Sequence, residues 1–294
     1  MSSPPVFAAI RPTSWDAARD LARRLPRSAF RGQPDASQVP STSIERAAAR
    51  LQYDRGDLYT LEERMVREAR RRARQYVSQV PEDDDALGWL ALLRHHGAPT
   101  RLLDFSNSFY VAVWFAIEGA DGDAAVWAVD LQRLREASVA RLAALDPALA
   151  ELPPEGWGVA KALLGRPDLG AGVVAVEPFH LDERLAAQQG MFLVSLDPSR
   201  SFVDNLAATF GVGELDFHQQ PRAFGAAAEA ADALAASVVE VVLPQALHRP
   251  AREDLWRMNL TAASFFPGMD GFARSLLYYV GLHQPGEEWE KPPG

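Results

Sequence analysis

A short stretch of the chain gathers side chains that act on charged ligands. His95 supplies a titratable base, Thr100 a hydroxyl, Arg101 a bidentate donor and Asp104 a carboxylate. A metal site that uses both His95 and His96 is not expected, because adjacent residues on a helix point away from each other. The stretch therefore indicates acid–base or anion-binding chemistry. Its structural alternative is an Arg101–Asp104 ion pair that only fixes the loop.

A second polar segment is Phe30-Arg31-Gly32-Gln33, in which a strand-like run ends in an arginine. Gly32 allows the backbone to turn or to approach a ligand closely. Arg31 can then present its planar guanidinium to a phosphate or a carboxylate, with Gln33 beside it as a further binding candidate. The structural alternative is that Arg31 pairs with a neighbouring acid at a turn.

Glu240 is the best-placed further carboxylate, because it lies in an alternating strand pattern from Val239 to Leu243. Its structural alternative is an ordinary solvent-facing strand residue. The chain contains no cysteine, which excludes disulfides, thiol nucleophiles and cysteine-ligated zinc. It also lacks the P-loop, the dinucleotide-binding glycine fingerprint, the Gly-x-Ser-x-Gly elbow and the His-Glu-x-x-His motif, and no metal site is expected.

The charge of the chain is uneven. A net charge of −9 argues against broad electrostatic binding of nucleic acid. Five arginines nevertheless crowd about two helical turns, namely Arg67, Arg70, Arg71, Arg72 and Arg74. This stretch predicts either a solvated helix face balanced by Glu62, Glu63 and Glu68, or a phosphate-binding strip that can hold nucleic acid.

The elements that must position these residues follow from capping signals and hydrophobic patterns. Thr13 to Asp16 open a helix, Gly97 and Pro99 end another, and the apolar run from Phe109 to Ile117 predicts a buried helix, with a strand as the alternative. The first of these helices covers residues 17–25, and the one that ends at Gly97 covers residues 84–96. Further helices are expected at residues 58–79, 132–164 and 225–236, and strands at 28–31, 124–130, 172–176, 191–196 and 237–243.

This order of elements predicts an α+β fold, with a mixed or antiparallel sheet flanked by helices in a single domain at residues 13–280. Residues 1–12 and 284–294 are expected to be frayed ends. No apolar run reaches the length of a membrane span, and no signal peptide is visible, so we expect a cytoplasmic protein without membrane partners.

Both polar segments resemble the FRG domain family, which is named for the tripeptide that stands here as Phe30-Arg31-Gly32. The family's QHYG-x-PTRLLDWT pattern is similar to residues 94–106, where Arg94 replaces the glutamine, His96 the aromatic residue, Phe105 the tryptophan and Ser106 the threonine. Further similar segments are Val111–Ala116, Arg184 with Gln188–Phe192, and Ser264–Gly271. The resemblance spans residues 13 to 275, and the Pro-Thr-Arg-Leu-Leu-Asp block makes it specific.

The tripeptide is also similar to the aromatic-Arg-Gly strand with which arginine-type ADP-ribosyltransferases hold NAD. The resemblance implies an ADP-ribosyltransferase-like fold and an NAD-dependent ADP-ribosyltransferase or NAD glycohydrolase, in the role of a toxin or phage-defence effector with an inhibitory partner protein. It implies NAD binding by Arg31, Gln33, Thr100, Arg101 and Gln188, and catalysis by His95, Asp104 and Glu240. Ser41-Thr42-Ser43 repeats a Ser-Thr-Ser signature of those enzymes, but too close to Arg31 for the helix and strand that should intervene.

Two alternatives remain open at the level of sequence. One is a binding module that recognises a nucleotide, a nucleic acid or a protein without turnover. The other is a hydrolase or nuclease that uses His95 as general base with Asp104 as its partner. The macromolecular acceptor of a transferase is not indicated by any motif.

Overall fold

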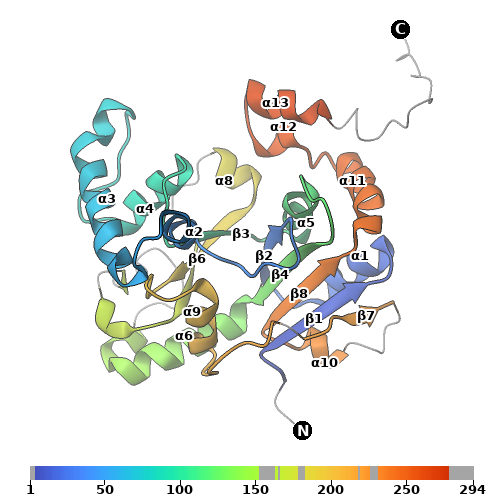
Figure 1. Cartoon of the computed structure of the whole chain (residues 1–294), viewed down its shortest axis with the longest axis horizontal. Helices are drawn as coiled ribbons and strands as arrows, with labels where there is room; N and C mark the ends of the chain where they lie inside the picture. Colours follow the sequence, from blue (N-terminus) through green and yellow to red (C-terminus); the bar gives the residue numbers. More distant parts are fainter. Residues whose placement is uncertain are drawn as a thin grey trace.

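One eight-stranded mixed sheet organises the structure, with the strand order β5-β6-β3-β2-β4-β8-β1-β7 (Figure 1). The computed structural model describes residues 4–151, 163–164, 166–177, 183–217, 219–225 and 231–277. The strands are β1 (Phe7–Pro12), β2 (Ser28–Gln33), β3 (Leu102–Ser106), β4 (Ala124–Asp130), β5 (Val173–Val176), β6 (Gly190–Ser195), β7 (Arg222–Phe224) and β8 (Val238–Leu243). β1 runs parallel to β7 and β8, and the other neighbouring pairs are antiparallel. The α+β fold class with a mixed sheet flanked by helices is confirmed.

Helices cover the sheet and close its ends. They are α1 (Trp15–Arg24), α2 (Ser43–Leu51), α3 (Leu58–Arg72), α4 (Ala86–His95), α5 (Phe109–Ile117), α6 (Leu131–Leu145), α8 (Glu183–Ala187), α9 (Phe202–Thr209), α10 (Ala231–Leu234), α11 (His248–Arg257), α12 (Ala262–Phe265) and α13 (Met269–Ser275). In Figure 1, α3 and α4 lie at one end of the sheet, and α1 and α11 lie at the other. Within the described residues, no helix is both long and apolar enough to cross a membrane.

The apolar run from Phe109 to Ile117 forms helix α5, as the sequence predicted, and not a strand. Ser108 caps it by accepting a hydrogen bond from the backbone N–H of Val111. The helix packs against β2 at Gly32, where an added Cβ would lie 2.0 Å from the carbonyl oxygen of Ala112. Only glycine permits this approach, so the tripeptide glycine sets the distance between α5 and the sheet.

Two apolar clusters lie on the opposite faces of the central strands. The first joins α5, α1 and α11 to one face through residues such as Ile10, Leu21 and Val241. The second joins the other face to α6 and α9, and its members include Trp127 and Phe202. Alternate residues of β8 enter alternate clusters, as the period of two in a strand requires.

The structure departs from the predicted elements at the N-terminal strand and in two internal helices. Phe7 to Pro12 are not frayed, because they form β1 between β8 and β7, and Ile10 is fully buried. The helix expected at residues 132–164 ends at Leu145, and much of its remainder lies outside the described residues. The expected helix at residues 58–79 continues beyond Arg72 only as a 3₁₀ turn. Residues 284–294 lie outside the described residues.

Candidate functional site

The sheet opens between β2 and β3. These strands pair at Phe30 and Ser106. From there β2 continues along β4 as far as Gln33, and β3 continues along β6 to Leu102, with no further β2–β3 pair in the described register. The two strands therefore diverge, and the residue that follows Phe30 enters the gap.

Arg31 bridges this gap. Its Nη1 donates a hydrogen bond of 2.7 Å to the backbone carbonyl of Asp104. Its Nε is buried and has no hydrogen-bond partner among the described residues. Burial lowers the pKa of Arg31 to about 10; the charge of Asp104 opposes this shift, while Arg94 and Arg46 reinforce it. Arg31 remains cationic at neutral pH and holds donor capacity that the protein does not use.

Asp104 forms its ion pair with Arg94. The Nε of Arg94 donates to Oδ2 of Asp104 at 3.0 Å, and Nη2 makes a second contact to the same oxygen. Burial alone would raise the pKa of Asp104, but the hydrogen bond from Arg94 and the charges of Arg94, Arg31 and Arg184 hold it below its ordinary value. The carboxylate is thus ionised at neutral pH and accepts hydrogen bonds without donating any.

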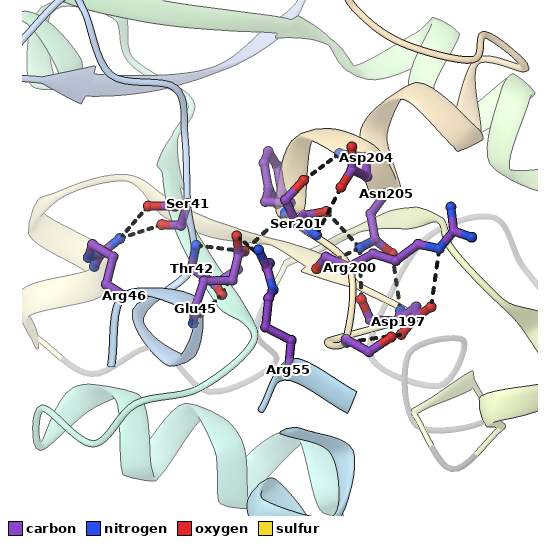
Figure 2. Close-up of polar contacts among 12 residues, drawn as sticks. Ser41, Thr42, Glu45, Arg46, Arg55, Asp197, Arg200, Ser201, Asp204 and Asn205 are labelled. Atoms are coloured by element: carbon purple, nitrogen blue, oxygen red, sulfur yellow. Dashed lines mark hydrogen bonds and ion pairs between the residues drawn. The ribbon is translucent and has the colours of Figure 1, made fainter. Parts of the chain in front are cut away.

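Arg46 adds a further positive charge. Burial lowers its pKa, and the neighbouring charge of Arg94 lowers it further. Its Nη1 donates to the backbone carbonyl and to the hydroxyl of Ser41, the latter at 3.3 Å (Figure 2). Arg46 is therefore held at the start of α2, close enough to Arg94 for the two charges to interact.

Figure 2 shows what fixes the start of α2. Glu45 and Thr42 form a capping box, in which the Glu45 carboxylate accepts from the backbone N–H of Thr42 at 3.0 Å. The same oxygen accepts from the backbone N–H of Phe202, the first residue of α9, also at 3.0 Å. Arg55 donates to the second carboxylate oxygen at 3.1 Å. One carboxylate thus joins the N-termini of two helices and positions the segment that carries Arg46.

Arg31, Arg94 and Asp104 line a cleft of about 1670 Å³. Its polar lining includes Arg31, Arg74, Arg94, His95, His96, Arg184, Gln188 and the two carboxylates Asp85 and Asp104. Its apolar lining includes Phe30, Phe105, Phe115 and Phe192. Asp85 caps α4 by accepting from the backbone N–H of Gly88 at 2.9 Å. Arginines outnumber carboxylates, so the cleft favours an anionic ligand with apolar rings.

Four of the residues singled out in the sequence meet at this cleft: Arg31, His95, Asp104 and Gln188. The cleft lining does not include Gln33, Thr100, Arg101 or Glu240. Gln33 is buried and donates to the backbone carbonyls of Gln38 and Val39. Thr100 is fully buried, and its N–H donates to the hydroxyl of Ser43 at 3.0 Å.

Arg101 has a different role from the one expected. It is 2% exposed and pairs with Glu62 of α3, which is 3% exposed, rather than with Asp104. Its Nη1 also donates to the backbone carbonyl of Leu196 at 3.0 Å. The side chain is enclosed by protein partners, and it anchors α3 to the start of β3 instead of facing a ligand. The expected ion pair between Arg101 and Asp104 is therefore wrong, because Arg101 pairs with Glu62 and Asp104 pairs with Arg94.

Glu240 lies on the same face of the sheet as Arg31. Arg31 is opposite Trp127 on β4, and Trp127 is opposite Glu240 on β8. Neighbouring strands lie about 4.8 Å apart, so the two backbones are separated by about 10 Å. Glu240 is 5% exposed and not solvent-facing, and burial raises its pKa to about 7. Neither its carboxyl group nor the buried Nε1 of Trp127 has a hydrogen-bond partner among the described residues.

Sequence reasoning did not select three arginines of this region, Arg46, Arg94 and Arg184. Arg94 stood out only as the replacement of a family glutamine. Arg184 lies on α8, and its guanidinium stacks on the ring of Phe266 at 4.7 Å. Ser41-Thr42-Ser43 forms the capped start of α2 and not a strand, which separates it from the signature of the transferases. No single spacing could have indicated this convergence, because the residues come from separate elements.

Comparison with known proteins gives one match. The family model of the FRG domain matches residues 26–124, which run from the approach to β2 to the first residue of β4. The match contains Arg31, Arg94, His95 and Asp104, and it ends before Gln188 and Glu240. No curated protein and no solved structure matches the chain.

Proposed function

We propose that this protein, which carries an FRG domain, binds NAD in the cleft between β2 and β3 and cleaves its nicotinamide–ribose bond, as an ADP-ribosyltransferase or an NAD glycohydrolase. The observation that carries the proposal is that Arg31, which donates to the backbone carbonyl of Asp104, and the Asp104 carboxylate, which is ionised at neutral pH, meet in a sheet gap lined by further arginines.

The arginines would hold the diphosphate. Arg31 and Arg94 enter the cleft from β2 and α4, and Arg184 enters from α8. Guanidinium groups bind phosphate oxygens through paired, charge-assisted hydrogen bonds. The apolar walls, which include Phe105 and Phe192, give the adenine and nicotinamide rings surfaces to pack against.

The chemistry requires a group that stabilises positive charge on the ribose. When the bond between nicotinamide and C1′ breaks, its electron pair leaves with the nicotinamide nitrogen, which becomes neutral. The ribosyl group then carries the positive charge, and a nearby carboxylate stabilises it. Water or an acceptor nucleophile adds to C1′ and gives up a proton, and His95, which lines the cleft, is the base that we assign to it.

Two carboxylates are available for the stabilising role. Asp104 lies in the cleft and stays ionised at neutral pH. Glu240 shares the face of Arg31 across Trp127 and has a pKa of about 7, so only part of its population is ionised at neutral pH. Asp104 is therefore the first carboxylate to test, and Glu240 is the second.

The test is to incubate the purified protein with NAD and to quantify nicotinamide and ADP-ribose by chromatography, with NAD binding followed by calorimetry. Arg31→Ala should weaken NAD binding by about 10- to 150-fold and lower nicotinamide release. Arg23→Ala is the matched control, because Arg23 is exposed on α1 and has no ion pair among the described residues. If the parent neither binds NAD nor releases nicotinamide, the proposal fails.

A second candidate is a hydrolase or nuclease that acts on phosphodiester bonds. The observation that favours it is that His95 and His96 line the same cleft as the arginines, with their rings 4.8 Å apart. Histidine pairs beside bound phosphate can exchange protons with the attacking and leaving oxygens. Degradation of labelled RNA or DNA without nicotinamide release would favour this reaction. Binding of either ligand without turnover would instead identify a binding module.

The cellular role follows from the reaction. An enzyme that consumes NAD acts where NAD is found, so we place it in the cytoplasm as a toxin or phage-defence effector. An inhibitory partner protein would act most simply by covering the cleft. Expression in growing bacteria should lower cellular NAD, and Arg31→Ala should remove that effect. Unchanged NAD in the expressing cells would contradict the effector role.

A further inference from the structure

The exposed side of α3 carries a stripe of arginines. Residues that recur at three- and four-residue spacing share one face of a helix. Arg64, Arg67, Arg70, Arg71 and Arg74 follow this spacing, are all exposed and continue from α3 into the 3₁₀ turn Ala73–Gln75. We refer to these five residues as the arginine stripe. Its face is opposite to the buried residues Leu58, Glu62 and Val66.

The orientation of the stripe is fixed by the core. Glu62 accepts a hydrogen bond from the backbone N–H of Arg101 at 2.9 Å and pairs with its guanidinium. Leu58 and Val66 are buried on the same side of α3. The helix therefore cannot rotate about its axis without removing a charged pair from its buried partners, and the stripe is held toward solvent.

Most of the stripe is not neutralised by the protein. Arg71 pairs with Glu68 at 2.7 Å, whereas Arg64, Arg67 and Arg70 have no ion pair among the described residues. Arg70 and Arg71 lie in the last turn, where their positive charges interact favourably with the negative end of the helix dipole. That effect acts within the last turn and does not explain Arg64 and Arg67. In a chain of net charge −9, the stripe is a local concentration of positive charge.

The stripe leads into the cleft. Arg74 belongs to the stripe and also lines the cleft. The residues from Val77 to Pro81, which follow it in the sequence, line the cleft as well. Between them lies Tyr76, which is 80% exposed. An exposed aromatic ring beside arginines is the arrangement on which an unpaired base stacks while its phosphates contact the guanidinium groups.

We propose that the arginine stripe binds the backbone of a single-stranded nucleic acid, whose terminal nucleotide stacks on Tyr76 and enters the cleft. From Arg64 to Arg74 the helix rises about 15 Å, which corresponds to roughly four nucleotides at about 3.4 Å each. The proposal deepens the proposed function, on which it rests for the chemistry, by naming the class of macromolecule that would be the acceptor or the substrate.

Acidic residues limit how far the strand can extend. Glu82 and Asp83 are exposed and lie between Pro81 and Asp85, which both line the cleft. They repel phosphates that pass beyond the cleft mouth. Their position favours a strand that ends in the cleft over one that passes through it.

The test measures the binding of fluorescent single strands of about 12 nucleotides, one of uridine and one of thymidine, by anisotropy across a salt series. The stripe variant is Arg64→Ala, Arg67→Ala and Arg70→Ala together. The matched control is Arg23→Ala, Arg249→Ala and Arg257→Ala, which removes the same charge from α1 and α11 at the other end of the sheet (Figure 1). Melting curves check that both variants remain folded.

The stripe variant should bind about tenfold more weakly or worse, and the slope of log K against log salt should fall by about 2, since each lost contact removes about 0.7. Tyr76→Ala should weaken binding about 5- to 150-fold, the range expected for the loss of one stacked base. Equal affinity for the two strands would assign recognition to phosphate, and preference for uridine would assign part of it to the 2′-hydroxyl. The control should bind like the parent.

The proposal is overturned if the parent does not bind either strand at low salt, or if the control weakens binding as much as the stripe variant. Glu82→Gln with Asp83→Asn should strengthen binding, and an unchanged affinity would contradict entry into the cleft. Cleavage of free NAD should be the same in the stripe variant as in the parent, since Arg64, Arg67 and Arg70 do not line the cleft. If the parent cleaves NAD but binds no oligonucleotide, this proposal fails and the proposed function stands. If the parent binds the oligonucleotides but does not cleave NAD, the proposed function fails and this proposal stands.

Discussion

The guanidinium of Arg31 spans the gap between β2 and β3 and donates a hydrogen bond to the backbone carbonyl of Asp104, replacing the ladder bonds that these strands do not make. Arg31 thus has two tasks, since it ties the diverging strands together and keeps an unused donor. This connection makes the stability of the gap depend on the same residue to which we assign the diphosphate.

Substitution of Arg31 should therefore lower both stability and NAD binding. Loss of a charged hydrogen bond costs about 1.5–3 kcal/mol, and the same range corresponds to a loss of affinity of about 10- to 150-fold. Arg31→Lys keeps the charge but loses the planar fork, so its NAD affinity should be close to that of Arg31→Ala. Calorimetry and urea unfolding measure the two effects. A lysine variant that binds NAD like the parent would show that charge alone suffices.

Asp104→Asn should make the protein less sensitive to acid. The pKa of Asp104 is below its ordinary value in the folded state, so its ion pair stabilises the fold above the unfolded pKa and is lost as pH falls through the folded pKa. The side chain is 37% exposed, so solvent screening limits the loss at neutral pH to about 1–2 kcal/mol. The measurement is unfolding free energy from pH 7 to pH 2. Parallel curves for parent and variant would contradict this role.

Glu240→Gln should stabilise the protein at alkaline pH. The folded pKa is raised from 4.5 to about 7, so the native state binds more protons than the unfolded state between these values. Parent stability therefore falls as pH rises through this window, by on the order of 3 kcal/mol in total. The glutamine variant should lack this fall and be the more stable protein at pH 8. If the parent shows no slope between pH 4.5 and pH 7, the carboxyl group is not buried without a partner.

Gly32→Ala should disrupt the packing of α5 against β2, because the new Cβ would lie 2.0 Å from the carbonyl oxygen of Ala112 and 2.5 Å from the backbone nitrogen of Ala116. Backbone atoms cannot rotate away, so we expect a loss of about 3 kcal/mol or more. Gly122→Ala is the control, since an added Cβ there meets nothing within 4 Å. Thermal melting of both variants decides the matter, and equal melting temperatures would refute the close approach of α5.

Glu62→Gln or Arg101→Met alone should cost about 3–5 kcal/mol, because each leaves an uncompensated buried charge. The double variant Glu62→Met with Arg101→Met should be more stable than either single variant, since it leaves no such charge. Chemical unfolding of the three variants gives the coupling energy. Additive losses would mean that the two residues act independently.

The local features of the fold follow from the sequence, because they depend on neighbours along the chain. The apolar run at Phe109 and the alternation of β8 each contain their own signal, whereas β2 continues through Gly32 to Gln33 where the sequence predicted that the strand would end. The ion pairs do not. Arg101 and Asp104 are three residues apart on an extended chain, so they point to opposite sides of it, and each finds a partner on another helix.

β1 shows the same limit on prediction. Its first residues looked like a free end, because the partners that bury Ile10 lie more than 200 residues later in β7 and β8. The row of Arg31, Trp127 and Glu240 could not be read from the sequence either, since it depends on the register of three strands. Of the residues singled out in the sequence, Arg31, His95, Asp104 and Gln188 line the cleft, because each belongs to a segment that is compact in sequence.

β1 cannot pair with its neighbours in the sheet until a late stage of synthesis. β1 is synthesised before every other described strand, yet both of its neighbours, β7 and β8, follow more than 200 residues later. Glu45 likewise waits for Phe202, which lies 157 residues later, before it can join α2 to α9. A nascent chain therefore carries an unpaired β1 until β7 and β8 are synthesised, and its α2 is not joined to α9 until Phe202 is synthesised. Every residue that lines the cleft, up to Phe192, is synthesised before β7 and β8, so the cleft residues are present in the chain before the sheet beside them is complete.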